Sequence, residues 1–316
     1  MGFFYPQWQK ITRIGVTTPP TTTGYQVKVE IPWQPGMRDD FADLRFSDYY
    51  RTLPYWIETS TTRSTATVWV KLTEINSAAN EFFCYYGNGG ASSESNGDNV
   101  FEVFDHFDAA SVDTNKWTVT GSPTITNSIL SFTAGQGIAS KTLFGINVAI
   151  RERDANTKVT ASHVGFADGV SNYFIIRSEV MGAARRVILA IPPNARSASL
   201  TDVDTNYHIY ELRRNTSSLD AYIDNVSAGT YATAPTTQLP AFINVEAATS
   251  GSRSCDWVAV RKYQSTEPTC TPAEGGINTA FYQAVLRAKH IIQDSYPYTL
   301  AVSFITDHMH LTWTEP

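Results

Sequence analysis

The sequence predicts an all-β protein with two β-sandwich domains, followed by a short helix and a strand extension at the C-terminus. Three observations support this fold class. Apolar and polar residues alternate with a period of two in many short segments, and turn-forming residues separate these segments at regular intervals. A single segment near the C-terminus follows a helical period instead.

The first domain is expected over residues 1–103. Residues 25–31 read YQVKVEI, in which every second side chain is apolar, and residues 67–72 (TVWVKL) repeat this pattern. Residues 82–90 (FFCYYGNGG) form a strand pattern that runs into an Asn-Gly turn signal. The polar residues 91–99 then indicate a linker or a long loop.

Residues 43–72 are unusually aromatic, with three Tyr, two Trp and one Phe. Large rings are mostly buried in proteins, so Trp56 and Trp69 are expected to pack in a core or against a neighbouring domain. The alternative is an exposed aromatic platform.

The second domain is expected over residues 104–264. Strand patterns run from residues 100–108 (VFEVFDHFD) to residues 255–263 (CDWVAVRKY) at the spacing typical of a β-sandwich. Further strands are expected at residues 147–153, 158–168, 172–180, 185–191, 208–214 and 219–225.

The last segment, residues 265–316, begins with a connector rich in Pro, Gly and Thr. Residues 277–292 then carry apolar side chains at helical spacing, which predicts one amphipathic helix. Two short strands, residues 298–305 and 308–313, close the chain. The apolar stripe of the helix is expected to pack either on this chain or on a neighbour.

The charge pattern argues against nucleic acid as a partner. The 316 residues include 24 Lys and Arg and 30 Asp and Glu, and the basic residues are scattered rather than gathered in a stripe. No uncharged apolar run approaches the roughly 20 residues that span a bilayer. The N-terminal residues lack the apolar core of a signal peptide, which predicts synthesis and release in the cytosol.

The three cysteines have different expected roles. Cys84 lies in an apolar strand pattern and is expected to be a small buried hydrophobe. Cys255 and Cys270 flank the end of the second domain and could form a disulfide, although reduced thiols are expected in a cytosolic product.

Two stretches of the chain resemble known families. The motifs QWQKITRIGV, DLRFSD, LPYWIE, ATVWVKL, FFCYYGN and VFEVFDHFD give residues 1–104 a resemblance to the family named domain of unknown function 2341. The motifs FDHFDAASVDTNKW, HIYELRRNTSSLDAYIDN and CDWVAVRKY make residues 104–263 similar to a concanavalin A-like lectin/glucanase (laminin G-like) jelly roll. The second resemblance implies a two-sheet sandwich that binds glycans or packs in extracellular or virion surface proteins.

No catalytic residue is predicted. Hydrolases of the sandwich family carry the motif Glu-x-Asp-x-(x)-Glu on one strand, and here only Glu152 and Asp154 begin such a motif. Asn156 and Thr157 stand where the third carboxylate would be, so the two acids are interpreted as solvated charges and the chain is predicted not to be an enzyme.

Other sites are weakly indicated. The jelly-roll resemblance implies that a structural calcium ion could bind near Asp105, Asp108 and Asp256, and no other cofactor is expected. His308 and His310 share a strand face without a third ligand at a recognisable spacing, which favours surface or interface histidines over a metal site.

For a ligand, the expected location is a sandwich face that carries Tyr173, Arg177 and Tyr222. Aromatic rings and an Arg fork suit sugars or carboxylated glycans. The alternative is that these are ordinary solvent-facing strand residues.

The function predicted from these features is a structural protein of a virion, which decorates the capsid or forms a tail fibre or receptor-binding subunit of a tailed virus. Its partners would be copies of itself, other virion proteins and host glycans. The alternative is a cell-surface or secreted carbohydrate-binding or adhesion module, although that module would need an export signal.

Overall fold

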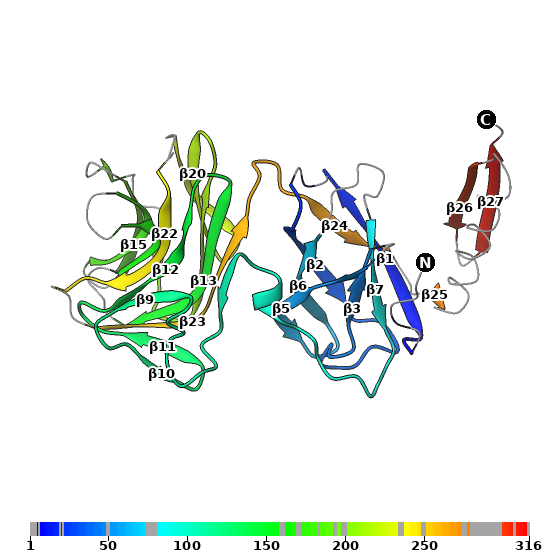
Figure 1. Cartoon of the computed structure of the whole chain (residues 1–316), viewed down its shortest axis with the longest axis horizontal. Helices are drawn as coiled ribbons and strands as arrows, with labels where there is room; N and C mark the ends of the chain where they lie inside the picture. The colour runs from blue at the N-terminus through cyan, green and yellow to red at the C-terminus, as the bar shows by residue number, and fades with distance from the viewer. Residues whose placement is uncertain are drawn as a thin grey trace. The chain divides into compact units, whose positions relative to one another are not determined.

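The structure is a computed structural model in which nearly all regular structure is β (Figure 1). Among the residues that it describes, the one helical element is a short 3-10 turn, η1 (Gly97–Asn99), so the all-β prediction is confirmed. The described residues are 5, 7–18, 20, 22–48, 51–73, 81–157, 162–168, 172–181, 184–191, 195–196, 201–232, 237–247, 251–273, 277–278, 299–305 and 308–314.

The chain divides into two compact units. The first unit contains Met1–Asn96 and Pro268–Pro316, and the second contains Gly97–Glu267. Each sheet that the structure describes lies wholly within one or the other of the two units, and each unit has its own apolar core. The sequence-based division into residues 1–103, 104–264 and 265–316 differs in two respects: the boundaries between the units lie at 96/97 and 267/268, and the chain beyond residue 267 belongs to the first unit.

The first unit contains a six-stranded sheet, a three-stranded sheet and a hairpin. The six-stranded sheet has the order β24 (Thr269–Pro272), β1 (Lys10–Thr17), β7 (Glu81–Tyr86), β3 (Arg45–Ser47) and β4 (Thr52–Leu53), with β25 (Ile277–Asn278) also paired to β1. The three-stranded sheet has the order β2 (Tyr25–Pro32), β6 (Thr65–Leu72) and β5 (Tyr55–Thr61).

The two tryptophans singled out in the first unit, Trp56 and Trp69, are buried. Trp56 and Trp69 lie opposite each other on β5 and β6, and they are 6% and 2% exposed. The indole N–H of Trp69 also donates a hydrogen bond to Glu58 at 2.6 Å. These observations confirm buried packing and exclude the exposed platform.

The segment predicted as a connector contains strand β24. Pro272 lies opposite Ile14 and Cys270 lies opposite Val16, so β24 extends the sheet at the edge of β1. The connector prediction was wrong here because an unpaired strand edge gains backbone hydrogen bonds from any extended segment that can reach it.

The two terminal strands are confirmed as the hairpin β26 (Thr299–Ile305) and β27 (His308–Thr314). The first two residues of the predicted helix, Ile277 and Asn278, form β25 instead. The rest of that predicted helix lies outside the described residues.

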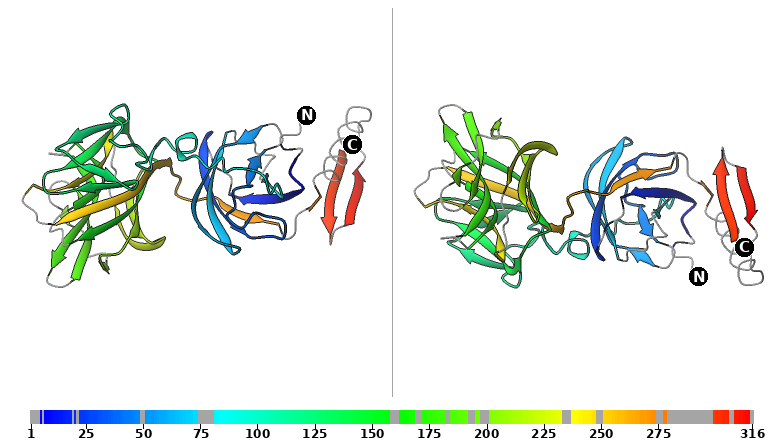
Figure 2. Two further views of the ribbon diagram at one scale, coloured as in Figure 1. Left: turned by 90° about the horizontal axis from the view of Figure 1, so that it is seen from below. Right: turned by 90° about the horizontal axis from the view of Figure 1, so that it is seen from above.

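The second unit is a sandwich of two eight-stranded sheets, which Figure 2 shows from two further directions. The first sheet, here named the β13 sheet, has the order β10 (Thr124–Thr126), β11 (Ile129–Phe132), β23 (Ser252–Lys262), β13 (Val148–Thr157), β19 (His208–Arg214), β20 (Ser218–Ile223) and β21 (Val226–Ala232), with β8 (Val103–Asp105) on β23. The second, the β14 sheet, has the order β17 (Ala195–Arg196), β16 (Ala184–Ile191), β15 (Tyr173–Met181), β14 (Ser162–Ala167), β22 (Leu239–Val245), β12 (Gly137–Phe144) and β9 (Trp117–Thr120), with β18 (Thr201–Val203) on β16.

The core of the second unit lies between these two sheets. Because side chains of a strand point alternately to its two faces, every second residue of the central strands enters this core. On β22, for example, Ala241 and Ile243 are fully buried in the core, while Phe242 and Asn244 lie on the opposite face. The expected two-sheet sandwich is therefore confirmed for this unit.

Candidate functional site

The outer face of the β14 sheet brings together polar and aromatic side chains from neighbouring strands of the second unit. His163 on β14 lies directly opposite Arg177 on β15 and Asn244 on β22, so three adjacent strands contribute to one place. We call this place the β14 face and define it by Tyr173, Arg177, His163, Phe242, Asn244 and Glu246.

The polar half of the β14 face is a chain of contacts centred on Glu246. The imidazole Nδ1 of His163 lies 2.8 Å from Asn244 Oδ1, and its Nε2 lies 3.1 Å from Glu246 Oε1. The guanidinium Nη1 of Arg177 lies 3.2 Å from the same carboxylate oxygen. Because amide and carboxylate oxygens only accept hydrogen bonds, Nδ1 of His163 is the donor in the contact with Asn244, and Nε2 faces a second acceptor, Glu246.

The apolar half of the β14 face is a small cluster outside the main core. Tyr173 and Phe242 pack against Ala167 and Ile175, which are themselves 3% and 4% exposed. The face therefore carries aromatic surface at one end and a carboxylate, an amide and a guanidinium at the other. This combination suits a sugar ring, which has an apolar C–H face and a polar hydroxyl edge.

Gly165 sits between these two halves on β14. Its φ is +155°, and a Cβ at this position would lie 2.2 Å from the carbonyl oxygen of Phe174. Any larger residue would push β15 away from β14, so glycine is what allows the strands that carry Tyr173 and Arg177 to stay close to His163.

The predicted ligand residues do not share one face. Tyr173 and Arg177 lie on β15 in the β14 sheet, whereas Tyr222 lies on β20 in the β13 sheet. The ring of Tyr222 is covered by the guanidinium of Arg213, which lies 3.8 Å from the ring centroid. The prediction of one face with all three residues was therefore wrong, because the sequence does not show which strands share a sheet.

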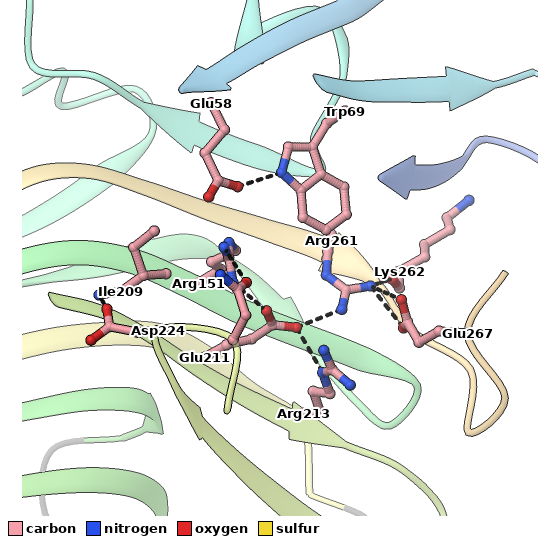
Figure 3. A network of polar contacts seen from close by, with 11 residues as sticks. Glu58, Trp69, Arg151, Ile209, Glu211, Arg213, Asp224, Arg261, Lys262 and Glu267 are labelled. Atoms are coloured by element: carbon pink, nitrogen blue, oxygen red, sulfur yellow. Dashed lines mark hydrogen bonds and ion pairs between the residues drawn. The ribbon is translucent and has the colours of Figure 1, made fainter. Parts of the chain in front are cut away.

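The outer face of the β13 sheet carries a buried ion-pair network (Figure 3). Glu211 accepts hydrogen bonds from Arg151 at 2.7 Å, Arg213 at 2.8 Å and Arg261 at 2.5 Å. Burial would raise the pKa of Glu211, but these three guanidinium groups hold it well below its usual range. Arg261 also pairs with Glu267 at 3.0 Å, so each of the three guanidinium groups has a carboxylate partner within the network.

The acids of the incomplete hydrolase motif are not solvated charges. Glu152 and Asp154 both lie on the inward face of β13 and are 0% exposed. Each pairs with the guanidinium of Arg253, which reaches Asp154 Oδ2 at 3.1 Å and also contacts Glu152. The interpretation as surface charges was wrong, because alternation on β13 turns both acids into the sandwich, where both contact Arg253.

The three candidate calcium ligands bind different partners. Asp105 accepts a hydrogen bond from the indole of Trp117 at 2.8 Å, and Asp108 accepts one from the hydroxyl of Ser128 at 2.9 Å. Asp256 pairs with Arg153. Within the described ranges, no group of three His, Cys, Asp or Glu side chains could hold a metal ion, so these residues do not fit a shared calcium site.

The described cysteines are free thiols. Cys84 is 1% exposed and belongs to the core of the first unit, which confirms its predicted role. Cys255 and Cys270 are not joined, so the disulfide that the sequence left open does not form. His308 and His310 lie on β27, and their side chains are outside the described part of the chain.

Sequence reasoning missed four members of the β14 face, His163, Phe242, Asn244 and Glu246. All four occupy or follow strand patterns that are visible in the sequence, on β14 and β22. These two strands are about 80 residues apart, as in the His163–Asn244 contact, and nothing in the sequence indicates that they pair.

Comparison with known proteins gives one partial family match. The family described as Domain of unknown function (DUF2341) matches residues 40–120, which is less than half of the chain. No curated protein matches the sequence. No helix long and apolar enough to cross a bilayer occurs among the residues described.

Several solved structures resemble the chain over about half of its length. An endo-β-1,3-glucanase from Pyrococcus furiosus has 12% sequence identity and a TM-score of 0.42, and the match covers 53% of this chain and 95% of that one. β-Agarase A from Zobellia galactanivorans has 14% identity and a TM-score of 0.41, with 54% and 91% covered. A lichenase derived from a mouse hindgut metagenome has 13% identity and a TM-score of 0.40, with 51% and 98% covered.

These similarities bear on two predictions. The prediction that the chain is not an enzyme is contradicted, because the similar structures are glucanases and an agarase. The virion interpretation has no support among the comparisons, and the carbohydrate-related alternative agrees with them better.

Proposed function

We propose that this chain is a carbohydrate-binding protein that acts at a cell surface or in secreted form, and that the β14 face is its binding site. The observation that carries the proposal is that one sheet face carries the rings of Tyr173 and Phe242 and, further along the same strands, Glu246 in contact with His163 and Arg177.

The chemistry of the β14 face favours hydroxyl groups as its partners. Glu246 and Asn244 present oxygen acceptors, and Arg177 presents N–H donors, so both ends of a sugar hydroxyl can be satisfied. Glu246 already offsets the charge of Arg177 at 3.2 Å. A carboxylated sugar would approach Glu246 and be repelled, so neutral polysaccharides are the expected ligands.

Affinity electrophoresis against a panel of neutral and carboxylated polysaccharides tests this proposal. The full chain is expected to be retarded by at least one neutral polysaccharide. Tyr173→Ala and Phe242→Ala should each lower the affinity for that polysaccharide by about tenfold, because each removes ring surface from the site. Glu246→Gln should weaken it as well, since it removes the charge that orders His163 and Arg177.

Tyr222→Ala is the matched control, because it removes a tyrosine ring from the other sheet of the same unit. Its affinity should equal that of the unmodified chain. Equal losses in Tyr222→Ala and Tyr173→Ala, or no retardation by any polysaccharide, would reject the β14 face as a glycan site. Reducing-end release measured in the same samples shows whether a bound polysaccharide is also cleaved.

A further inference from the structure

A single buried guanidinium connects the two sheets of the second unit from inside. Arg253 belongs to β23 in the β13 sheet and is 2% exposed. Its Nη1 donates a hydrogen bond to the backbone carbonyl of His163 on β14 at 2.8 Å. The interaction therefore joins the interior of the sandwich to the backbone of a residue whose side chain lies on the β14 face.

The guanidinium of Arg253 is held in place on its other side. Asp154 contacts its Nε at 3.1 Å, and Glu152 contacts its Nη2. Both acids project from β13, the strand that pairs with β23 along ten residue positions. Since a guanidinium is planar and binds in fixed directions, two carboxylates on one strand fix the direction in which Nη1 points.

The guanidinium of Arg253 keeps its positive charge in the core. Burial lowers the pKa of Arg253 to about 10, which still leaves it protonated at neutral pH. The hydrogen bond to His163 is thus charge-assisted and lies away from solvent, where such bonds are strongest.

The position of the His163 carbonyl controls the imidazole on the other side of the sheet. The His163 ring contacts Asn244 at 2.8 Å and Glu246 at 3.1 Å. It can keep both contacts only if the β14 backbone holds the Cα of His163 at a fixed position in the sheet. Gly165, two residues further on, leaves β14 without a side chain next to this point.

We propose that Arg253 is a positioning residue for the β14 face, which fixes the His163 imidazole against Asn244 and Glu246 by holding the His163 carbonyl from inside the sandwich. The consequence for ligand affinity rests on the proposed carbohydrate function, whereas the consequence for His163 itself does not.

Arg214 provides a matched control within the same core. It also lies in the interior, with its guanidinium 4.9 Å from the ring centroids of Phe166 and Phe174. It donates to the carbonyls of Phe144 at 3.1 Å and Thr237 at 2.7 Å. Arg214 thus joins the β13 sheet to the backbone at the end of β12 and at residue 237. Neither of these carbonyl acceptors belongs to the β14 face.

The test compares Arg253→Lys, the charge-neutral set Glu152→Gln/Asp154→Asn/Arg253→Gln, and Arg214→Gln in the full chain. Long-range 1H–15N spectra report the environment of the two imidazole nitrogens of His163, which contact Asn244 and Glu246. The two Arg253 variants should shift both His163 nitrogen signals, because the ring loses its fixed position against these acceptors, and Arg214→Gln should keep the unmodified pattern. Affinity for the polysaccharide retained by the unmodified chain should fall by about tenfold in the Arg253 variants only.

A folded Arg253 variant with an unchanged His163 spectrum would overturn the proposal. If the variants do not fold, the unmodified chain provides the test. Scalar coupling between Arg253 Nη1 and the His163 carbonyl carbon is then expected across their hydrogen bond, and its absence would also overturn the proposal. Loss of the His163 pattern without any polysaccharide binding would support the positioning role while rejecting the proposed function.

Discussion

His208, at the start of β19, has a carboxylate beside each of its ring nitrogens. Nδ1 lies 2.7 Å from Asp224 and Nε2 lies 2.9 Å from Asp204. Both nitrogens can donate only when the ring is protonated. Partial burial opposes the charge, but the hydrogen bonds to Asp224 and Asp204 outweigh it and raise the pKa of His208. The charged ring therefore joins the residues before β19 to the turn after β20.

We expect the stabilisation by His208 to depend on pH. A raised pKa in the folded state adds stability that is complete below the unfolded value of about 6.5 and is lost as pH rises through the folded value. His208→Gln should therefore lower the free energy of unfolding more at about pH 5.5 than at about pH 9. Urea unfolding at both pH values measures this difference.

His106→Gln is the control for this experiment, because its ring is half exposed and lies 3.4 Å from a single carboxylate, Asp108. It should change the free energy of unfolding little at either pH. An equal loss at both pH values in His208→Gln would show that the ring contributes by packing alone.

At the same scale, sequence reasoning identified charged residues but not their partners. Glu152 and Asp154 were noticed as a pair on one strand, which is correct, and their common face follows from the period of a strand. Their burial could not be predicted, because it depends on Arg253, which lies about 100 residues further along the chain.

Among the elements, the returning strand β24 has the largest effect on how the chain is organised. The backbone N–H of Ala273, just after β24, donates to the carbonyl of Arg13 at 2.8 Å. Because hydrogen-bonded pairs alternate in an antiparallel ladder, Gly15 and Thr271 form the next such pair. The N-terminal strand β1 thus has a partner on each side, β7 and β24.

Thr271→Pro should destabilise the first unit by about 1–3 kcal/mol, because proline removes the N–H that this pair requires and leaves a carbonyl unpaired. Hydrogen exchange should become faster in β1 and β7 and stay unchanged in β13 and β23 of the second unit. Thr271→Val keeps the N–H and should exchange like the unmodified chain. Faster exchange in both units would contradict the assignment of β24 to the first unit alone.

About half of the described strands could be predicted from the sequence, mainly those whose alternation is regular over six residues or more. Residues 25–31, 67–72 and 208–214 all correspond to observed strands, β2, β6 and β19. β24 was missed because it is a four-residue strand without apolar alternation and contains a proline. Its pairing comes from the sheet edge that it meets rather than from its own pattern.

For the whole molecule, the division into two units with separate sheets and cores is the main structural fact. The β14 face is built entirely from residues of the second unit. A glycan-binding role of this face therefore needs only residues 97–267, whatever the first unit does.

A fragment of residues 97–267 is expected to fold and to bind the same polysaccharide with about the affinity of the full chain, because its core and its binding face are complete. Circular dichroism and affinity electrophoresis check the two parts of this prediction. A folded fragment without affinity would show that the first unit or the C-terminal residues contribute to binding.

The composition of the site could be predicted only in part at this scale. The strand predicted over residues 172–180 is confirmed as β15, and it carries Tyr173 and Arg177 on the β14 face. Tyr222 was placed with them, although strand order puts β20 in the other sheet. Sheet membership depends on contacts between strands far apart in sequence, and a single sequence does not contain that information.

The most direct test of the account is hydrogen exchange of the full chain with and without a saturating oligosaccharide from the polysaccharide that it retains. The account predicts slower exchange in β14, β15 and β22, and no change in β13, β19 and β20. Protection confined to the β13 sheet or to the first unit, with β14, β15 and β22 unaffected, would contradict it.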